Sequence, residues 1–193
     1  MPISKIEDAI KDIKKGKMVI LVDDQDRENE GDLIISAEFA TPEAINFMAT
    51  HGRGLICLSV DNNKAKKLDL SPVKSPSDDN LDSTAFTVSI DAKKDVTTGI
   101  SAHDRSKTAM MVASDSSVAD DFDRPGHMFP LIARDGGILV RAGHTEASVD
   151  ISRIAGLKPC AVICEIMNDD GSMARLKDCE KFAKKHKIKI ATI

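Results

Sequence analysis

Short apolar runs alternate with segments of helical periodicity along this chain, and this alternation constrains the fold more than any other feature of the sequence. The runs are too short for buried helices and are typical of strands. Strands are expected at 18–22, 33–35, 55–60, 84–90, 128–133, 138–141, 160–166 and 188–193. Helices are expected within 4–16, 41–49, 104–113, 145–156 and 178–187. This mixture predicts an α/β fold of the α+β type, in which a mixed β-sheet is layered with helices.

The length of the chain, 193 residues, suits one compact domain. No internal repeat or low-complexity linker divides the chain, so we expect a single domain over residues 1–193. The segment 69–83 combines prolines, serines and aspartates, a composition that buries little apolar surface. We expect this segment to be a lid over a binding site.

Composition excludes several classes of function. Aromatic residues make up 3% of the chain and the formal net charge is −4, which predicts no nucleic-acid partner. No apolar run approaches the ~20 residues of a membrane-spanning helix, which predicts no membrane partner. The four cysteines show no CxxC spacing and are expected to be reduced core thiols, which favours a cytoplasmic protein.

Six carboxylates and one arginine lie within ten residues, in the segment DDQDRENEGD at 23–32. The segment directly follows an expected strand, the position at which α/β folds place ligands. So much negative charge is unfavourable unless a cation or hydrogen bonds offset it, and carboxylate oxygens suit Mg²⁺ or Mn²⁺. The position of the glycine excludes an EF-hand calcium loop. A solvated acidic loop is the alternative interpretation.

The segment RAGHT at 141–145 lies where an expected strand ends and an expected helix begins. An arginine, a glycine, a hydroxyl and the free N–H groups of a helix N-terminus together suit a phosphate group. The imidazole of His144, in the same turn, can bind a metal ion. Alternatively, Thr145 only caps the helix and His144 is a surface residue.

Two further titratable residues are candidates for catalysis. His127 lies in a turn constrained by two prolines and a glycine (DRPGHMFP, 123–130), where a histidine is more often structural. Glu165 interrupts the apolar run at 160–166. If it is buried, its protonated form is favoured and it suits acid–base catalysis, whereas strand alternation also allows it to face water. The hydroxyl- and glycine-rich turn at 97–105 either contacts a sugar phosphate or only caps a helix.

These clusters together favour an enzyme that uses a divalent metal ion on a small phosphorylated substrate. The residues alone leave a sugar-phosphate isomerase, a phosphatase and a lyase open. A non-catalytic module that binds a phosphate or a nucleotide is the remaining alternative. Such a module would need the anion-binding turn but no histidine–carboxylate pair.

Seven segments carry a resemblance to a known family. They are DDQDRENEGDLI (23–34), GLICLSV (54–60), TAFTVSIDA (84–92), TTGISAHDRSKT (97–108), DRPGHMFPL (123–131), RAGHTEASVD (141–150) and CEIMNDDGSMARL (164–176). In this order they resemble 3,4-dihydroxy-2-butanone 4-phosphate synthase, an enzyme family of riboflavin biosynthesis. The resemblance implies a homodimer that converts D-ribulose 5-phosphate into 3,4-dihydroxy-2-butanone 4-phosphate and formate. It also implies Mg²⁺ or Mn²⁺ as the cofactor, with two ions per active site.

The resemblance assigns roles to individual residues. Glu28 and His144 correspond to the metal-binding positions, and His127 and Glu165 correspond to the catalytic acid–base pair. The substrate-binding positions correspond to Arg27, Glu28, Asp32, Arg141, Ala142, Gly143, His144, Thr145 and Glu165.

Two features differ from many members of the family. The lead into the expected strand at 84–90 reads NLDSTAF and contains no tyrosine, a residue that the whole chain lacks. Many relatives also carry a fused GTP cyclohydrolase II domain, which this sequence does not include. A monofunctional form is therefore expected.

Overall fold

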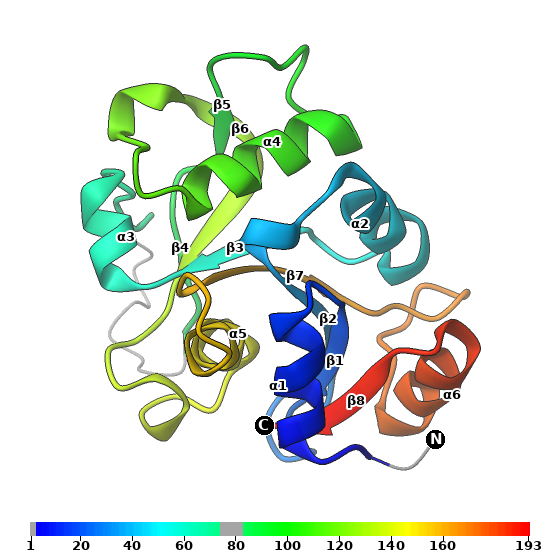
Figure 1. Ribbon diagram of the computed structural model, residues 1–193. Coiled ribbons are helices and arrows are strands. Elements are labelled where there is room, and N and C mark those ends of the chain that lie inside the picture. The colour runs from blue at the N-terminus through cyan, green and yellow to red at the C-terminus, as the bar shows by residue number, and fades with distance from the viewer. Residues whose placement is uncertain (1–2, 74–82) are drawn as a thin grey trace.

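The structure, a computed structural model, describes residues 3–73 and 83–193 (Figure 1). Within these residues an eight-stranded sheet has the order β4-β6-β3-β7-β2-β1-β8, and β5 pairs with β6. The pairs β1/β8 and β3/β6 are parallel and the others are antiparallel, as predicted for a mixed sheet. The strands are β1 (Val19–Val22), β2 (Gly31–Ser36), β3 (Cys57–Val60), β4 (Ala85–Phe86), β5 (Ile90–Ala92), β6 (Phe122–Ile132), β7 (Cys160–Glu165) and β8 (Lys189–Thr192).

Helices cover both faces of the sheet. Figure 1 shows α1 and α5 together on one face, with α2 and α4 on the other. The α-helices are α1 (Ile6–Lys14), α2 (Pro42–Phe47), α3 (Asn62–Lys67), α4 (Ala102–Ala113), α5 (His144–Ile154) and α6 (Leu176–His186). Short 3-10 helices span Ala37–Phe39, Ala119–Asp121 and Gly137–Leu139, and a π-helix spans Met48–Gly52. The α/β fold class predicted from the sequence is therefore confirmed.

The central strands explain why short apolar runs predicted the sheet. β1 and β3 are buried at every position because helices cover both of their faces. A strand that is covered twice is apolar along its whole length. Leu58 and Met128 belong to the core on the side of α2 and α4, whereas Cys57 and Ile163 pack on the side of α1 and α5.

The start of α2 follows the prediction, whereas the start of α5 does not. The hydroxyl of Thr41 accepts a hydrogen bond from the N–H of Ala44 (3.3 Å), as an N-cap residue does. The N-cap of α5 is Gly143, whose carbonyl accepts from the N–H of Ala147 (3.0 Å). The expectation that Thr145 caps this helix is wrong, because Thr145 already lies inside the first turn.

The strand expected at 138–141 is also wrong. Gly136 and Gly137 both have positive φ and turn the chain into a 3-10 helix over Gly137–Leu139. The apolar side chains of this run are not buried, since Leu139 is 94% exposed. An apolar run therefore predicted a strand where the chain makes a surface turn.

The strand expected at 84–90 is present only in part. It is divided into β4 and β5, and Ile90 alone of its alternating apolar residues is fully buried. Phe86 and Val88 are exposed by 38% and 43%, so the predicted buried face is wrong. Phe86 instead lines the candidate site described below.

Three further expectations concern the lid, the cysteines and the membrane. Residues 74–82 of the expected lid at 69–83 lie outside the described residues. All four cysteines are free and buried, as expected for core thiols. None of the described helices combines the length and the hydropathy that crossing a membrane requires.

Candidate active site

A pocket of about 230 Å³ lies on the α5 side of the sheet. The loop after β1, the start of β2, the end of β7 and the start of α5 supply its polar lining. All the predicted substrate-binding residues except Ala142 and Gly143 line this pocket. The full lining is Arg27, Glu28, Asp32, Cys57, Thr84, Phe86, Leu131, Arg141, His144, Thr145, Ile163 and Glu165.

The acidic loop after β1 is built around Asp23, whose side chain is fully buried. One oxygen of Asp23 accepts from the guanidinium of Arg27 (2.8 Å) and from the N–H of Glu28 (3.1 Å). The other oxygen accepts from the N–H of Glu30 (2.8 Å). These bonds offset part of the negative charge and fix the path of the loop. The sequence placed Asp23 in the acidic cluster but gave it no individual role.

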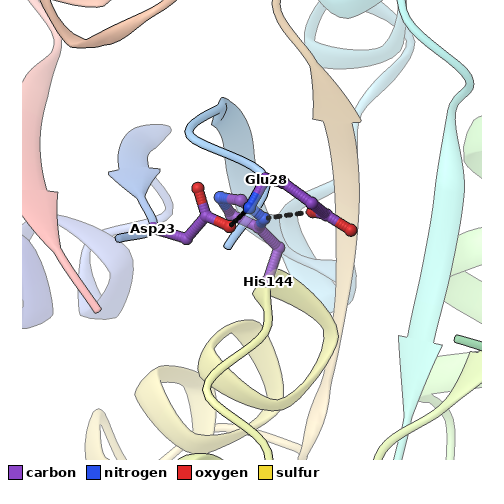
Figure 2. Close-up of side chains that lie close together, drawn as sticks. All are labelled: Asp23, Glu28 and His144. Atoms are coloured by element: carbon purple, nitrogen blue, oxygen red, sulfur yellow. Dashed lines mark hydrogen bonds and ion pairs between the residues drawn. The ribbon is translucent and has the colours of Figure 1, made fainter. Parts of the chain in front are cut away.

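Glu28 reaches from this loop toward His144 at the start of α5, as Figure 2 shows. Oε2 of Glu28 lies 3.7 Å from Nδ1 of His144, and Asp23, Glu28 and His144 offer ligand atoms within 4.8 Å of one another. The contact with His144, assisted by Arg27, outweighs the effect of burial and lowers the pKa of Glu28 to about 2. Glu28 is therefore ionised at neutral pH.

Asp32, the second residue of β2, lies beneath the same imidazole. Its Oδ1 is 3.9 Å from Nδ1 of His144, and its side chain is 5% exposed. Burial raises the pKa of Asp32 to about 7 although the charge of His144 opposes this. Burial alone would lower the pKa of His144, but Asp32, Glu28 and Asp23 outweigh it and raise that pKa to about 9. Asp23, Glu28, Asp32 and His144 thus form one cluster, in which negative charge is concentrated around the imidazole.

The residues present fit a divalent metal ion. Among the described residues, two buried atoms of the cluster, Oδ1 of Asp32 and Nε2 of His144, have no hydrogen-bond partner. Unpaired buried polar atoms are costly, and a cation offsets this cost where its ligands are carboxylate oxygens and imidazole nitrogens. Glu28 and His144 would hold such an ion.

Arg141 brings positive charge into the pocket, in contrast to the acidic residues around His144. Its side chain is only 4% exposed and donates to Oε2 of Glu146 (2.6 Å) and to the hydroxyl of Thr84 (2.8 Å). Oε1 of Glu146 accepts from the N–H of Arg134 (2.9 Å). Glu146 and Thr84 are partners that the sequence did not single out. They hold the guanidinium beside the N-terminus of α5, where a phosphate group is favoured.

Glu165 is the last residue of β7 and is partly buried. The sequence left open whether it is buried or faces water, and its exposure lies between the two. Its Oε2 accepts a hydrogen bond from the N–H of Leu55 (2.9 Å). In the register of β2 and β7 it lies directly opposite Asp32. Glu165 therefore borders the candidate metal site formed by Asp23, Glu28 and His144, although a different strand holds it.

His127 does not line this pocket. It belongs to β6, which is separated from β7 by β3, so the His127 and Glu165 backbones are two strand spacings, or about 10 Å, apart. Phe129 and Leu131 of β6 pack on the α5 side, and strand alternation places His127 on that face as well. The structure thus brings Glu165, but not His127, into contact with the pocket.

Residues 7–193 match the sequence pattern of the family described as 3,4-dihydroxy-2-butanone 4-phosphate synthase. The chain belongs to this family. The riboflavin biosynthesis protein RibBA of Aquifex aeolicus is 60% identical to it over 97% of the chain and 47% of the relative. The 3,4-dihydroxy-2-butanone 4-phosphate synthase of Photobacterium phosphoreum is 54% identical over 100% of the chain and 53% of the relative.

Solved structures of the 3,4-dihydroxy-2-butanone 4-phosphate synthase family share the fold. One, in complex with two magnesium ions, superposes with a TM-score of 0.93 at 42% identity, covering 98% of this chain and 93% of its own. The two-domain RibBX of A. baumannii gives a TM-score of 0.94 at 48% identity, covering 98% of this chain and 55% of its own. The chain spans about half the length of the curated relatives it matches.

Proposed function

We propose that this chain converts D-ribulose 5-phosphate into 3,4-dihydroxy-2-butanone 4-phosphate and formate, as a lyase of riboflavin biosynthesis. One observation carries the proposal: the unpaired buried atoms of Asp32 and His144 lie beside Glu28 and Glu165, in a pocket that also contains Arg141. A cation site, a carboxylate and an arginine within one pocket match the needs of a sugar phosphate that reacts through proton transfer. Membership of the family supports the same reaction.

The proposed cofactor is Mg²⁺ or Mn²⁺, with two ions per site. Glu28 and His144 would be the ligands from the chain, and the family structure that contains two magnesium ions supports this number. A bound cation would supply positive charge to stabilise the negative charge that develops on neighbouring substrate oxygens.

The substrate would be held by its phosphate group. Arg141 and Thr145 line the same pocket at the start of α5, whose N-cap is Gly143, so the guanidinium, the hydroxyl and the free N–H groups of the first turn would bind the phosphate. Arg27 also lines the pocket, whereas the side chain of Ala142 is exposed, so Ala142 would contribute only its backbone. The phosphate takes no part in bond making, so these contacts orient the sugar and supply binding energy.

Glu165 and His127 are the proposed proton-transfer residues. Loss of a proton beside the ketone gives an enediolate, and the later loss of a hydroxyl and excision of C4 need further proton transfers. The bond from Leu55 fixes the carboxylate of Glu165 beside the cluster. His127 occupies the same face of the sheet, two strands away. A substrate that both residues reach would extend across β3.

Of three further parts of the proposal, the homodimer rests on the resemblance, the single domain on the lack of an internal repeat or linker in the sequence, and the cytoplasmic location on the buried free cysteines. We infer that residues 1–193 form a single domain, that the protein is a homodimer, and that it acts in the cytoplasm.

A direct test incubates the protein with ribulose 5-phosphate and Mg²⁺ and assays formate. Formate and the four-carbon phosphate are expected in equal amounts. An isomerase would give another pentose phosphate without formate, a phosphatase would release inorganic phosphate, and a binding module would change nothing. Any of these three results would contradict the proposal.

A further inference from the structure

His127 is held by a single carboxylate on the neighbouring strand. Both oxygens of Asp91 in β5 bind it: Oδ1 accepts from its backbone N–H (2.8 Å), and Oδ2 lies 2.6 Å from its ring Nδ1. The side chain of Asp91 is 12% exposed, whereas that of His127 is 43% exposed. The covered edge of the imidazole is therefore the Nδ1 edge.

A glycine closes the covered side of this pair. Gly99 is buried with φ +91, and a Cβ there would overlap Oδ2 of Asp91 and lie 2.6 Å from Nδ1 of His127. Asp104 holds the glycine in place, because its carboxylate accepts from the N–H groups of Thr97 (3.1 Å) and Gly99 (3.0 Å). The turn at 97–105, which the proposed substrate site does not use, thus packs against the histidine–aspartate pair.

The contacts determine which ring nitrogen can exchange protons. A carboxylate accepts hydrogen bonds only, so the neutral imidazole must carry its proton on Nδ1. Nε2 is then left with its lone pair, and among the described residues no group bonds to it. A histidine that carries its proton on Nδ1 and has a free lone pair on Nε2 can accept a proton at Nε2.

We propose that Asp91 is a positioning residue: it fixes His127 as the Nδ1–H tautomer, so that Nε2 is the atom that transfers protons in the reaction. This inference rests on the proposed function, because it gives His127 its role in that chemistry. Asp91 itself neither touches substrate nor takes up the proton.

The first experiment reads the tautomer directly. Two-bond ¹H–¹⁵N spectra of the full chain, at a pH where the ring is neutral, distinguish a protonated Nδ1 from a protonated Nε2, and His127→Asn identifies the signal. We expect Nδ1–H in the wild type. In Asp91→Asn the amide oxygen still accepts from the backbone, while its NH₂ group donates to Nδ1 and forces the Nε2–H tautomer. A wild-type ring with Nε2–H, or an unchanged tautomer in the variant, would overturn the inference.

The second experiment measures turnover in the same variant. We expect Asp91→Asn to lower kcat by at least ~10²-fold with KM and melting temperature nearly unchanged, because only the proton acceptor is lost. Asp123→Asn is the matched control, since Asp123 faces Asp91 across β5 and β6, is exposed and makes no bond to His127. Its kcat should stay within about threefold of the wild type, an ordinary surface effect.

The two measurements separate the inference from the proposed function. Loss of activity in His127→Asn with normal turnover in Asp91→Asn would overturn the role of Asp91 alone. Normal turnover in His127→Asn would remove His127 from the proposed reaction, whatever the tautomer. Gly99→Ala gives an independent check, because its methyl group should displace the Asp91 carboxylate and weaken the preference of His127 for the Nδ1–H tautomer.

Discussion

Asp32 and Glu165 are direct cross-strand partners in the register of β2 and β7, so two carboxylates lie side by side at the end of the central sheet. Like charges in this position destabilise a sheet. The negative charge of Glu165 is one cause of the raised pKa of Asp32, after burial. Such an arrangement is stable when a cation or a substrate proton is shared with the pair. The pairing therefore adds to the negative charge beside the proposed metal site.

Replacement of Glu28 should remove metal binding without unfolding the chain. At a hundredfold excess over Kd, Mg²⁺ should stabilise the wild type by about 2.7 kcal/mol, which corresponds to a rise in Tm of roughly 5–10 °C. Glu28→Gln should show almost none of this rise and almost no formate production, while its Tm without metal stays near that of the wild type. The exposed Asp26 of the same loop supplies the control, since Asp26→Asn removes an equal charge. Full activity of the wild type in excess EDTA would contradict a metal requirement.

Metal binding should depend on pH through His144. Its pKa of about 9 in the metal-free fold means that the ring is protonated at neutral pH. A metal ion binds only the neutral imidazole, so each ion bound through His144 displaces one proton. The apparent affinity for Mg²⁺ should therefore rise by up to about tenfold per pH unit below pH 9. Calorimetry in buffers of different ionisation enthalpy measures the released proton, and an affinity independent of pH would exclude His144 as a ligand.

The same protonation should stabilise the metal-free fold. Because the folded-state pKa of His144 lies above its ordinary value of 6.5, this contribution is complete below pH 6.5 and is lost as the pH rises through 9. Asp32, with its pKa raised from 3.8 to about 7, acts in the same sense at lower pH. In EDTA, the Tm of the wild type should fall more between pH 6.5 and 9 than that of His144→Asn. Equal falls in the two proteins would argue against this coupling.

Arg141→Lys should weaken both binding and turnover. Lysine keeps the charge opposite Glu146 but cannot bond Glu146 and Thr84 together as the guanidinium does, so the group moves relative to the substrate. We expect kcat/KM to fall at least about tenfold, with changes in both constants. If the kinetics stay normal, the phosphate lies elsewhere. Arg105 is then the next candidate, because within the described part of the chain its side chain makes no ion pair and its buried Nε has no partner.

The sequence predicted the sheet better than its edges. β1 and β7 could be predicted because a strand covered by helices on both faces must be apolar throughout. The run Ile138–Val140 has the same composition but lies on the surface, so composition alone cannot separate the two cases. The prediction of a buried face for the strand at 84–90 is wrong for a related reason, since the apolar side chain of Phe86 lines the pocket instead of the core.

Some residues of the candidate site could be predicted from the sequence and others could not. His144 follows from the chemistry of RAGHT, whereas Glu28 is one of six carboxylates in the acidic loop and is singled out only by the resemblance. The partners of Arg141 could not be predicted, because the contact with Thr84 depends on how β4 pairs with β6 and the contact with Glu146 on where α5 begins. Such contacts arise from the packing of separate elements and leave no local pattern in the sequence.

The carboxylate of Glu165 should be essential for turnover but not for folding. Glu165→Gln can still accept the hydrogen bond from Leu55 through its amide oxygen, so the shape of the site is kept while the base is lost. We expect Glu165→Gln to bind Mg²⁺ and ribulose 5-phosphate but to lower kcat at least ~10²-fold in the formate assay. Gly54 offers a separate test of position, because a Cβ there would lie 2.5 Å from the backbone oxygen and 2.6 Å from Oε2 of Glu165 and would displace both the strand end and the carboxylate. Gly54→Ala should therefore lower kcat although the carboxylate remains. Gly171→Ala is a control for an added methyl group away from the site, since a Cβ there meets no atom within 4 Å, although Gly171, unlike Gly54, has positive φ. If Glu165→Gln only lowered Tm and kept its specific activity, Glu165 would be a structural residue and the proton transfer would belong to another group.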